Sequence, residues 1–188
     1  MSPIRRFSTL FFFPAIALCG CGDKTVDMSQ IQKPARPAEL DNYNVFVGKW
    51  DWKAEMLNAD AAHRNWSGTA EWEWALDNRG LHGRMMSSGG NISFESAGLW
   101  SVHPKSKKYV WWMFNNWGYM QNGKASYDAD TRTWKMPFKS TGLDGTASEG
   151  EYRITVVDNN TLKWELHEWA MMHMAKKIEM KGTYTRKS

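Results

Sequence analysis

The chain has 188 residues, with 24 Lys and Arg against 20 Asp and Glu, and a formal net charge of +4. Because this balance is nearly even and no basic cluster stands out, the sequence gives no basis for nucleic-acid binding. Its two cysteines, Cys19 and Cys21, lie close to the N-terminus. The remainder therefore contains no disulfide, no thiol catalyst and no thiolate metal site.

The N-terminal segment has the pattern of a secretory leader. Arg5 and Arg6 precede an apolar run over residues 7–18. This run has about the length of a secretory apolar region and is too short to remain as a transmembrane span. Residues 1–20 are therefore predicted to be a signal peptide, and their removal brings the chain closer to neutrality.

The end of this segment, "LCGC", resembles the lipobox of bacterial lipoproteins. Leu18 and the small Gly20 stand three and one residues before Cys21, which the resemblance makes the lipidated residue and the mature N-terminus. Gly22 follows where an Asp would favour retention at the inner membrane. The resemblance thus implies a periplasmic protein attached by lipid, at the outer membrane, with the membrane as a partner.

Residues 21–40 are predicted to be a flexible tether, since they hold two prolines, scattered charge and no hydrophobic periodicity. A short helix is expected over residues 41–47, with Asp41 as its N-cap. The folded domain is predicted to span residues 41–188, a length that suits one domain with a sizeable core.

The stretch "FVGKWDWKAEM" is typical of a strand with one buried face. Successive side chains of a strand point to opposite faces, so Trp50, Trp52, Ala54 and Met56 share one face and the charged residues share the other. From here the chain alternates in pieces of eight to twelve residues separated by turn signals. Further strands are predicted over residues 66–76, 80–88, 92–102, 109–116, 119–128, 131–138, 151–157, 161–169 and 176–186.

These segments predict an all-β fold of about ten antiparallel strands. An up-and-down β-barrel is favoured because closure removes exposed strand edges, and a β-sandwich is the alternative. A small barrel of this size can hold one small ligand. The segment 109–116, "YVWWMFNN", is apolar on both faces and is predicted to be covered on both.

Two positions resemble the lipocalins and the wider calycin superfamily. Gly48 and Trp50 form a G-x-W motif at the start of the first strand, and Arg186 lies in the last strand. In that superfamily the Trp closes the base of the barrel and a basic residue of the last strand lies across it. The resemblance therefore implies the same closing contact between Trp50 and Arg186.

The chain also resembles an uncharacterised bacterial family of secreted lipocalin-like domains. The shared features are "GKW" at 48–50, "HPKSKKY" at 103–109 and "YTRK" at 184–187, with His103 where the family usually has Asp. This resemblance implies the fold and assigns no chemistry.

The sequence contains no catalytic constellation. "HEWAMMH" places His167 and His173 six residues apart, whereas the helical zinc motif needs two His four residues apart. His63, His82 and His167 are expected to point outward, and Glu71 and Glu73 alternate with tryptophans on the solvated face. The interior positions are expected to be almost purely apolar, so we predict neither an enzyme nor a bound cofactor or metal.

The inward-facing aromatic side chains are the candidate ligand site. They can fill a solid core, or their flat rings can leave a slot for an apolar or aromatic ligand. The candidates are Trp52, Trp72, Trp74, Trp111 (or its neighbour Trp112), Trp134 and Trp164.

Three functions follow from these alternatives. The favoured one is an envelope lipoprotein whose barrel binds or carries a small apolar molecule or lipid. A filled barrel would instead serve a structural or interaction role in the envelope. The third is Cu(I) binding by "MMHM" at 171–174, since thioether and imidazole ligands suit Cu(I), although Met is also a common core filler.

Overall fold

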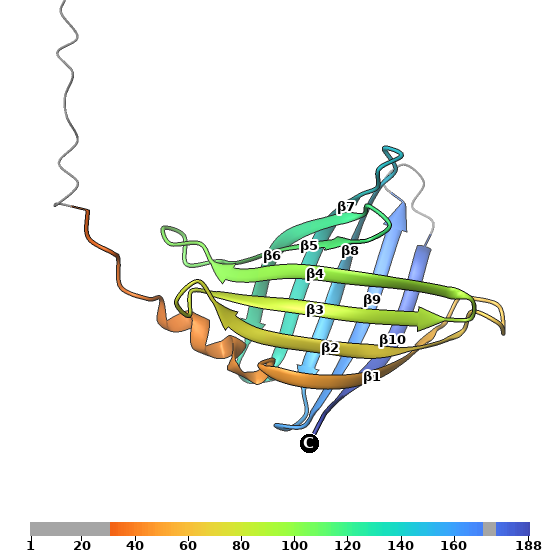
Figure 1. Cartoon of the computed structure of the whole chain (residues 1–188), viewed down its shortest axis with the longest axis horizontal. Helices are drawn as coiled ribbons and strands as arrows, with labels where there is room; N and C mark the ends of the chain where they lie inside the picture. The colour runs from red at the N-terminus through yellow and green to blue at the C-terminus, as the bar shows by residue number, and fades with distance from the viewer. Residues whose placement is uncertain (1–30, 171–175) are drawn as a thin grey trace, which may run out of the picture. The chain divides into compact units, whose positions relative to one another are not determined.

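The computed structural model describes residues 31–170 and 176–188. Ala35–Ser188 form one compact unit, in which a short 3-10 helix precedes ten β-strands (Figure 1). The elements are η2 (Ala38–Val45), β1 (Gly48–Met56), β2 (Asn65–Ala75), β3 (Gly80–Gly89), β4 (Ile92–Val102), β5 (Tyr109–Asn115), β6 (Met120–Asp128), β7 (Thr133–Thr141), β8 (Ala147–Val156), β9 (Thr161–Ala170) and β10 (Lys176–Arg186).

The ten strands form a closed barrel. Each strand pairs antiparallel with the next one in the sequence, and β10 returns to pair with β1 over Trp50↔Arg186 to Met56↔Met180. This is the up-and-down barrel that the sequence predicts, and the closing β1–β10 pair excludes the sandwich. We call the end where β1 begins and β10 ends the base, and the opposite end the mouth.

The strands of the barrel show the alternation of inward and outward side chains that the sequence predicts. Along β1, Trp50 and Trp52 are buried while Lys49, Asp51 and Lys53 are not. β7 and β9 alternate in the same way. A closed single sheet needs only an apolar inner face, because the outer face is left to solvent.

The base is closed by the contact that the G-x-W resemblance implies. The guanidinium carbon of Arg186 lies 4.2 Å from the centroid of the Trp50 ring, which is fully buried. Arg186 also donates hydrogen bonds to the carbonyl oxygens of Val45, Val47 and Asn159. Gly48 has φ +122°, and a Cβ there would meet this guanidinium, so glycine is required at this position.

The helix η2 adds an apolar plug at the base (Figure 1). Leu40 and Tyr43 are almost fully buried, and the Tyr43 ring stacks on Trp134 with 4.8 Å between centroids and 7° between planes. The predicted N-cap is wrong. The helix begins at Ala38, with Pro37 in the capping position and no capping side chain, whereas Asp41 forms an ion pair with Arg36 at 2.7 Å.

The prediction that residues 109–116 are covered on both faces is also wrong. Trp111 is buried in the interior, but Trp112 and Phe114 are 43% and 54% exposed on the outer face of β5. An apolar run on both faces is typical of a strand between two layers. Within the described part of the chain no second layer covers this face, so its apolar side chains meet solvent.

Candidate ligand-binding cavity

The barrel encloses a cavity of about 340 Å³ between its middle and its mouth. A second chamber of about 70 Å³ adjoins it toward the base. Both volumes share part of their lining, including Met85, Ser96, Met113, Tyr152 and Tyr184. The larger cavity falls in the size range of small-molecule sites, which starts at roughly 300 Å³.

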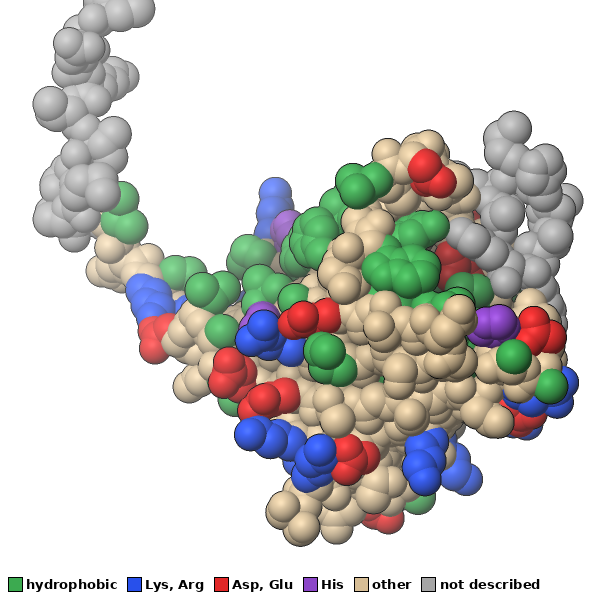
Figure 2. Space-filling view, turned by 45° about the vertical axis from the view of Figure 1, so that its right-hand side comes forward, with side chains coloured by type: hydrophobic (Ala, Val, Ile, Leu, Met, Phe, Trp, Pro, Cys, Tyr) green, Lys and Arg blue, Asp and Glu red, His purple; other side chains and the backbone are tan. Residues whose placement is uncertain are grey.

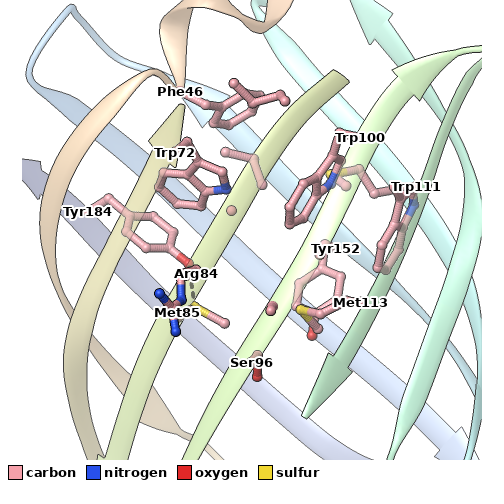
Figure 3. A pocket seen from close by; sticks show the side chains of 16 residues that line it. Phe46, Trp72, Arg84, Met85, Ser96, Trp100, Trp111, Met113, Tyr152 and Tyr184 are labelled. Carbon is pink, nitrogen blue, oxygen red and sulfur yellow. Dashed lines mark hydrogen bonds between the residues drawn. The ribbon is translucent and has the colours of Figure 1, made fainter. Parts of the chain in front are cut away.

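Aromatic and methionine side chains surround the smaller chamber (Figure 3). Trp72 and Tyr184 stand on one side of it, and Trp100 and Trp111 stand on the other. The hydroxyl of Tyr184 donates to the sulfur of Met85 at 3.4 Å. The chamber therefore offers mainly apolar contacts.

Four of the six predicted tryptophans line these two volumes. Trp72 and Trp111 line the smaller chamber, and Trp52 and Trp164 line the larger cavity.

The other two predicted tryptophans do not line the volumes described here. Trp134 is fully buried beneath Tyr43. Trp74 donates through its indole N–H to Asn44 at 3.0 Å and lies under the guanidinium of Arg36 at 5.0 Å. Both therefore contribute to the base of the barrel.

Five of the cavity-lining indoles lie against a glycine of the next strand. The partners stand directly opposite one another in the sheet, and a Cβ on the glycine would come within 2.4 to 3.1 Å of the ring. A side chain at any of these glycines would therefore force the ring or the backbone beside it to shift. The pairs are Trp52–Gly68, Trp66–Gly89, Trp72–Gly83, Trp111–Gly123 and Trp164–Gly182.

This pairing explains how a barrel with 12 Trp in its chain retains a cavity. A ring that covers a glycine can lie along the wall, since no Cβ holds it away from the neighbouring backbone. The rings therefore cover the wall and leave space along the barrel axis. The sequence already showed that these glycines occupy inward-facing positions, as the tryptophans do. The register of the strands was needed to show which glycine lies opposite which tryptophan.

The expectation of an almost purely apolar interior is wrong. Glu168, Ser140, Ser96 and Ser87 line the larger cavity and are at most 5% exposed. On β9, Glu168 follows Trp164 and Leu166 at every second position, so it lies on the same inward face. The alternation of the sequence alone was therefore enough to place it inside.

The polar side chains are joined by hydrogen bonds near the mouth. Ser148 donates through its hydroxyl to Glu168 Oε1, and Tyr152 donates to Gln121 Oε1 at 3.4 Å. Burial, with a smaller contribution from the charge of Glu168, raises the pKa of Tyr152 well above its usual value. Tyr152 therefore stays protonated and available as a donor at neutral pH.

Several buried polar atoms in the cavity wall have no hydrogen-bond partner among the described residues. They are the indole nitrogens of Trp52, Trp111 and Trp164 and the hydroxyl of Ser96, which is 2% exposed. The three indole nitrogens lie against the glycines of the next strand, so they face the wall of the barrel.

His63, His82 and His167 lie outside the cavity, as predicted. His82 and His167 face Glu73 and Glu179 across outer ion pairs of 3.7 and 3.6 Å, and His63 faces Asp60 at 3.0 Å. Over residues 31–170 and 176–188, no group of three His, Cys, Asp or Glu side chains could hold a metal. Cys21 and the segment 171–174 lie outside the described residues.

Comparison with known proteins identifies the fold alone. No family model matches the chain, and no curated protein matches its sequence. The crystal structure of Rv2717c from M. tuberculosis is similar, with a TM-score of 0.60 and 10% identity, over 82% of this chain and 100% of that one. The S-type phycobiliprotein lyase CPES from Guillardia theta is also similar, with a TM-score of 0.51 and 8% identity, over 79% and 92%. The chain has a lipocalin-like closed barrel.

Proposed function

We propose that this protein binds or carries a small, mainly apolar ligand inside its barrel. The observation that carries the proposal is the cavity of about 340 Å³, lined by aromatic and methionine side chains that lie along the wall. Apolar pockets with a few placed polar groups are the usual form of a small-molecule site. The glycine partners of the indoles support a container, because a filled core has no need to hold its rings against the wall.

We further propose that the protein works in the bacterial envelope, attached by lipid at Cys21. This part rests on the lipobox resemblance at residues 18–21 and on the apolar leader before it. An envelope location suits a carrier of apolar molecules, since the membrane is both their source and their destination. Over the described residues no helix is long and apolar enough to cross a bilayer.

Two measurements test ligand binding. Mass spectrometry of organic extracts, taken after native purification of the full chain from the membrane fraction, should reveal a retained apolar molecule. Titration with N-phenyl-1-naphthylamine should give saturable probe fluorescence and quench tryptophan emission. If no retained molecule is found and the probe gives no signal above the protein-free blank, the proposal is overturned and a filled barrel is favoured.

Two matched variants locate the bound probe. Trp164→Ala removes a ring from the cavity wall and should weaken probe binding. Trp112→Ala makes the same chemical change on the outer face, where the side chain is 43% exposed, and should leave binding unchanged. Equal effects of both changes would place the probe outside the cavity.

A second candidate function is interaction with an envelope partner through the outer surface. Apolar side chains of Trp112, Phe114 and Met120 are between 38% and 54% exposed on the paired strands β5 and β6. Hydrophobic side chains gather on the upper part of the face shown in Figure 2, whereas charged ones lie mainly on its lower part. Contiguous apolar surface of this kind marks interaction sites on many proteins. Replacing Trp112 and Phe114 by Ser should then abolish the interaction without changing probe binding.

A further inference from the structure

The larger cavity and the smaller chamber share a set of lining side chains, which we call the waist. Its members are Met85, Ser96, Met113, Tyr152, Ile154 and Tyr184. Figure 3 shows Tyr184 and Met85 on one side of it, and Tyr152 and Met113 on the other. Three of the six side chains carry a hydroxyl group. A ligand that extends from the larger cavity into the smaller chamber therefore passes these hydroxyls.

The hydroxyl of Ser96 has no hydrogen-bond partner among the described residues. Ser96 lies on the inner face of β4 and is 2% exposed. Its neighbour on β3 is the apolar Met85. Its neighbour on β5 is Asn115, whose Oδ1 already accepts from the backbone N–H groups of Trp117 and Tyr119 at 3.1 and 3.0 Å. Because burying a hydroxyl without a partner is costly, Ser96 is suited to donate to a ligand.

A second donor reaches the same part of the waist. The Tyr184 hydroxyl donates to the sulfur of Met85 at 3.4 Å, and Met85 stands directly opposite Ser96 in the sheet. A thioether is a weak acceptor, so an oxygen of a ligand can replace it. Burial raises the pKa of Tyr184 above its usual value, so this hydroxyl remains a donor at neutral pH. Two donors thus face one place that offers them no strong acceptor.

The surroundings of this place are apolar on both sides. Toward the base, the smaller chamber lies between Trp72 and Trp100 (Figure 3). Toward the mouth, Trp52 and Trp164 line the larger cavity, with 6.0 Å between their ring centroids. A charged group would be costly to bury here, whereas a carbonyl oxygen is uncharged and has two lone pairs, one for each donor.

We infer that the cavity binds an uncharged ligand with a carbonyl group in its middle, whose oxygen accepts hydrogen bonds from Ser96 and Tyr184. One apolar part of the ligand lies in the smaller chamber and the other lies in the larger cavity. Ketones and esters with apolar groups on both sides form this class. The inference rests on the proposed function, since it names the chemical class of ligand for the same cavity.

Three diphenyl compounds test the carbonyl preference on the unmodified full chain. Benzophenone, diphenylmethanol and diphenylmethane share two rings and differ in the central group, which is a carbonyl, an alcohol or a methylene. Their dissociation constants are measured by displacement of N-phenyl-1-naphthylamine. Benzophenone should bind at least about fivefold tighter than diphenylmethanol, because the alcohol buries an O–H that finds no strong acceptor at the waist. Equal or tighter binding of the alcohol would overturn the carbonyl preference.

Variants locate the carbonyl oxygen. Ser96→Ala should weaken benzophenone binding about five- to tenfold, the effect of one hydrogen bond, and change diphenylmethane binding less than about twofold. Tyr184→Phe keeps the ring and should also weaken benzophenone binding. Ser93→Ala makes the matched change on the exposed face of β4 and should leave all three affinities unchanged. Circular dichroism checks that the variants fold, and the comparison of the three compounds on the unmodified protein stands without them.

The outcomes separate this inference from the proposed function. If Ser96→Ala weakens benzophenone and diphenylmethane equally, or weakens neither, the inference is overturned while ligand binding stands. Unchanged benzophenone affinity in Tyr184→Phe overturns the role of Tyr184. If none of the three compounds displaces a bound probe, the inference alone is overturned. If the probe does not bind either, the proposed function is overturned as well.

Discussion

At the scale of single residues, Trp50 and Trp52 show why two tryptophans stand so close together. They point to the same face of β1, one pleat apart, but they serve different ends of the barrel interior. Trp50 is covered by Arg186 and donates its indole N–H to the carbonyl of Phe46 at 2.8 Å. Trp52 lines the cavity. The first therefore closes the base, and the second forms part of the wall.

A double-mutant cycle should measure the closing contact. With Trp50→Leu and Arg186→Met, we expect a coupling of about 0.5 to 2 kcal/mol in the free energy of unfolding from denaturant titrations, since the guanidinium lies desolvated over the ring. Trp111→Leu combined with Arg186→Met serves as the control and should be additive. Coupling indistinguishable from zero for the first pair would mean that the contact does not stabilise the closed barrel.

Buried tyrosines should make the barrel sensitive to alkali. Burial raises the pKa values of Tyr43, Tyr152 and Tyr184 above the ordinary value near 10. A raised pKa means that the protonated form is favoured by folding, so the stabilisation is complete below pH 10 and is lost as the pH rises further. Absorbance at 295 nm should therefore show tyrosinate forming together with loss of the far-UV circular dichroism. Ionisation of all tyrosines near pH 10 with the fold intact would contradict this.

At the scale of elements, the pairing of indoles with glycines determines what the strands enclose. Each ring lies over the backbone of its neighbouring strand, which widens the axial space and also covers the peptide groups of the glycine. The base follows a different rule. There η2 brings Leu40, Tyr43 and Phe46 onto Trp134, and the packing is solid.

Gly83→Ala should narrow the cavity from within. A Cβ at this position would lie 2.4 Å from Trp72 and 2.7 Å from Trp100, so both rings must move toward the axis. We expect weaker binding of N-phenyl-1-naphthylamine and a loss of about 1 to 3 kcal/mol in the free energy of unfolding, as for other overpacked interiors.

Two further variants control this result. Adding Trp72→Phe supplies a smaller ring and should restore part of the lost affinity. His82→Ala changes the preceding, outward-facing position of β3, where the side chain faces Glu73 at 3.7 Å, and should leave probe binding unchanged. Unchanged affinity in Gly83→Ala would show that the probe does not reach the smaller chamber.

At the scale of the whole molecule, the barrel and the N-terminal segment are predicted to play separate roles. Under the proposed function the barrel would hold the ligand, and the lipid would keep the barrel at the membrane. Cys21→Ala should abolish metabolic labelling with palmitate and leave an unprocessed precursor or release the protein from membrane fractions. Cys19→Ala serves as the control and should keep the label, because bulky Leu18 precedes it. Labelling that persists in Cys21→Ala would contradict the lipobox assignment.

The sequence by itself predicted ten strands and most of their inward faces, and it favoured the barrel over the sandwich. It missed the end of β7, which continues to Thr141, and the start of β8, which begins at Ala147. Alternation is a local property of the backbone, so residues such as Trp52 and Trp164 could be placed inside before any contact was known. The G-x-W resemblance also identified the closing pair of Trp50 and Arg186.

Tertiary structure alone decided whether the interior is filled or hollow. Alternation gives the face of a side chain but neither its depth nor its neighbour across the sheet, which depend on register and closure. Register placed Gly68 and Gly182 beneath indoles and thereby left a cavity. Register also set Glu168 beside Ser148 at the mouth, and closure left the outer face of β5 without a covering layer among the described residues.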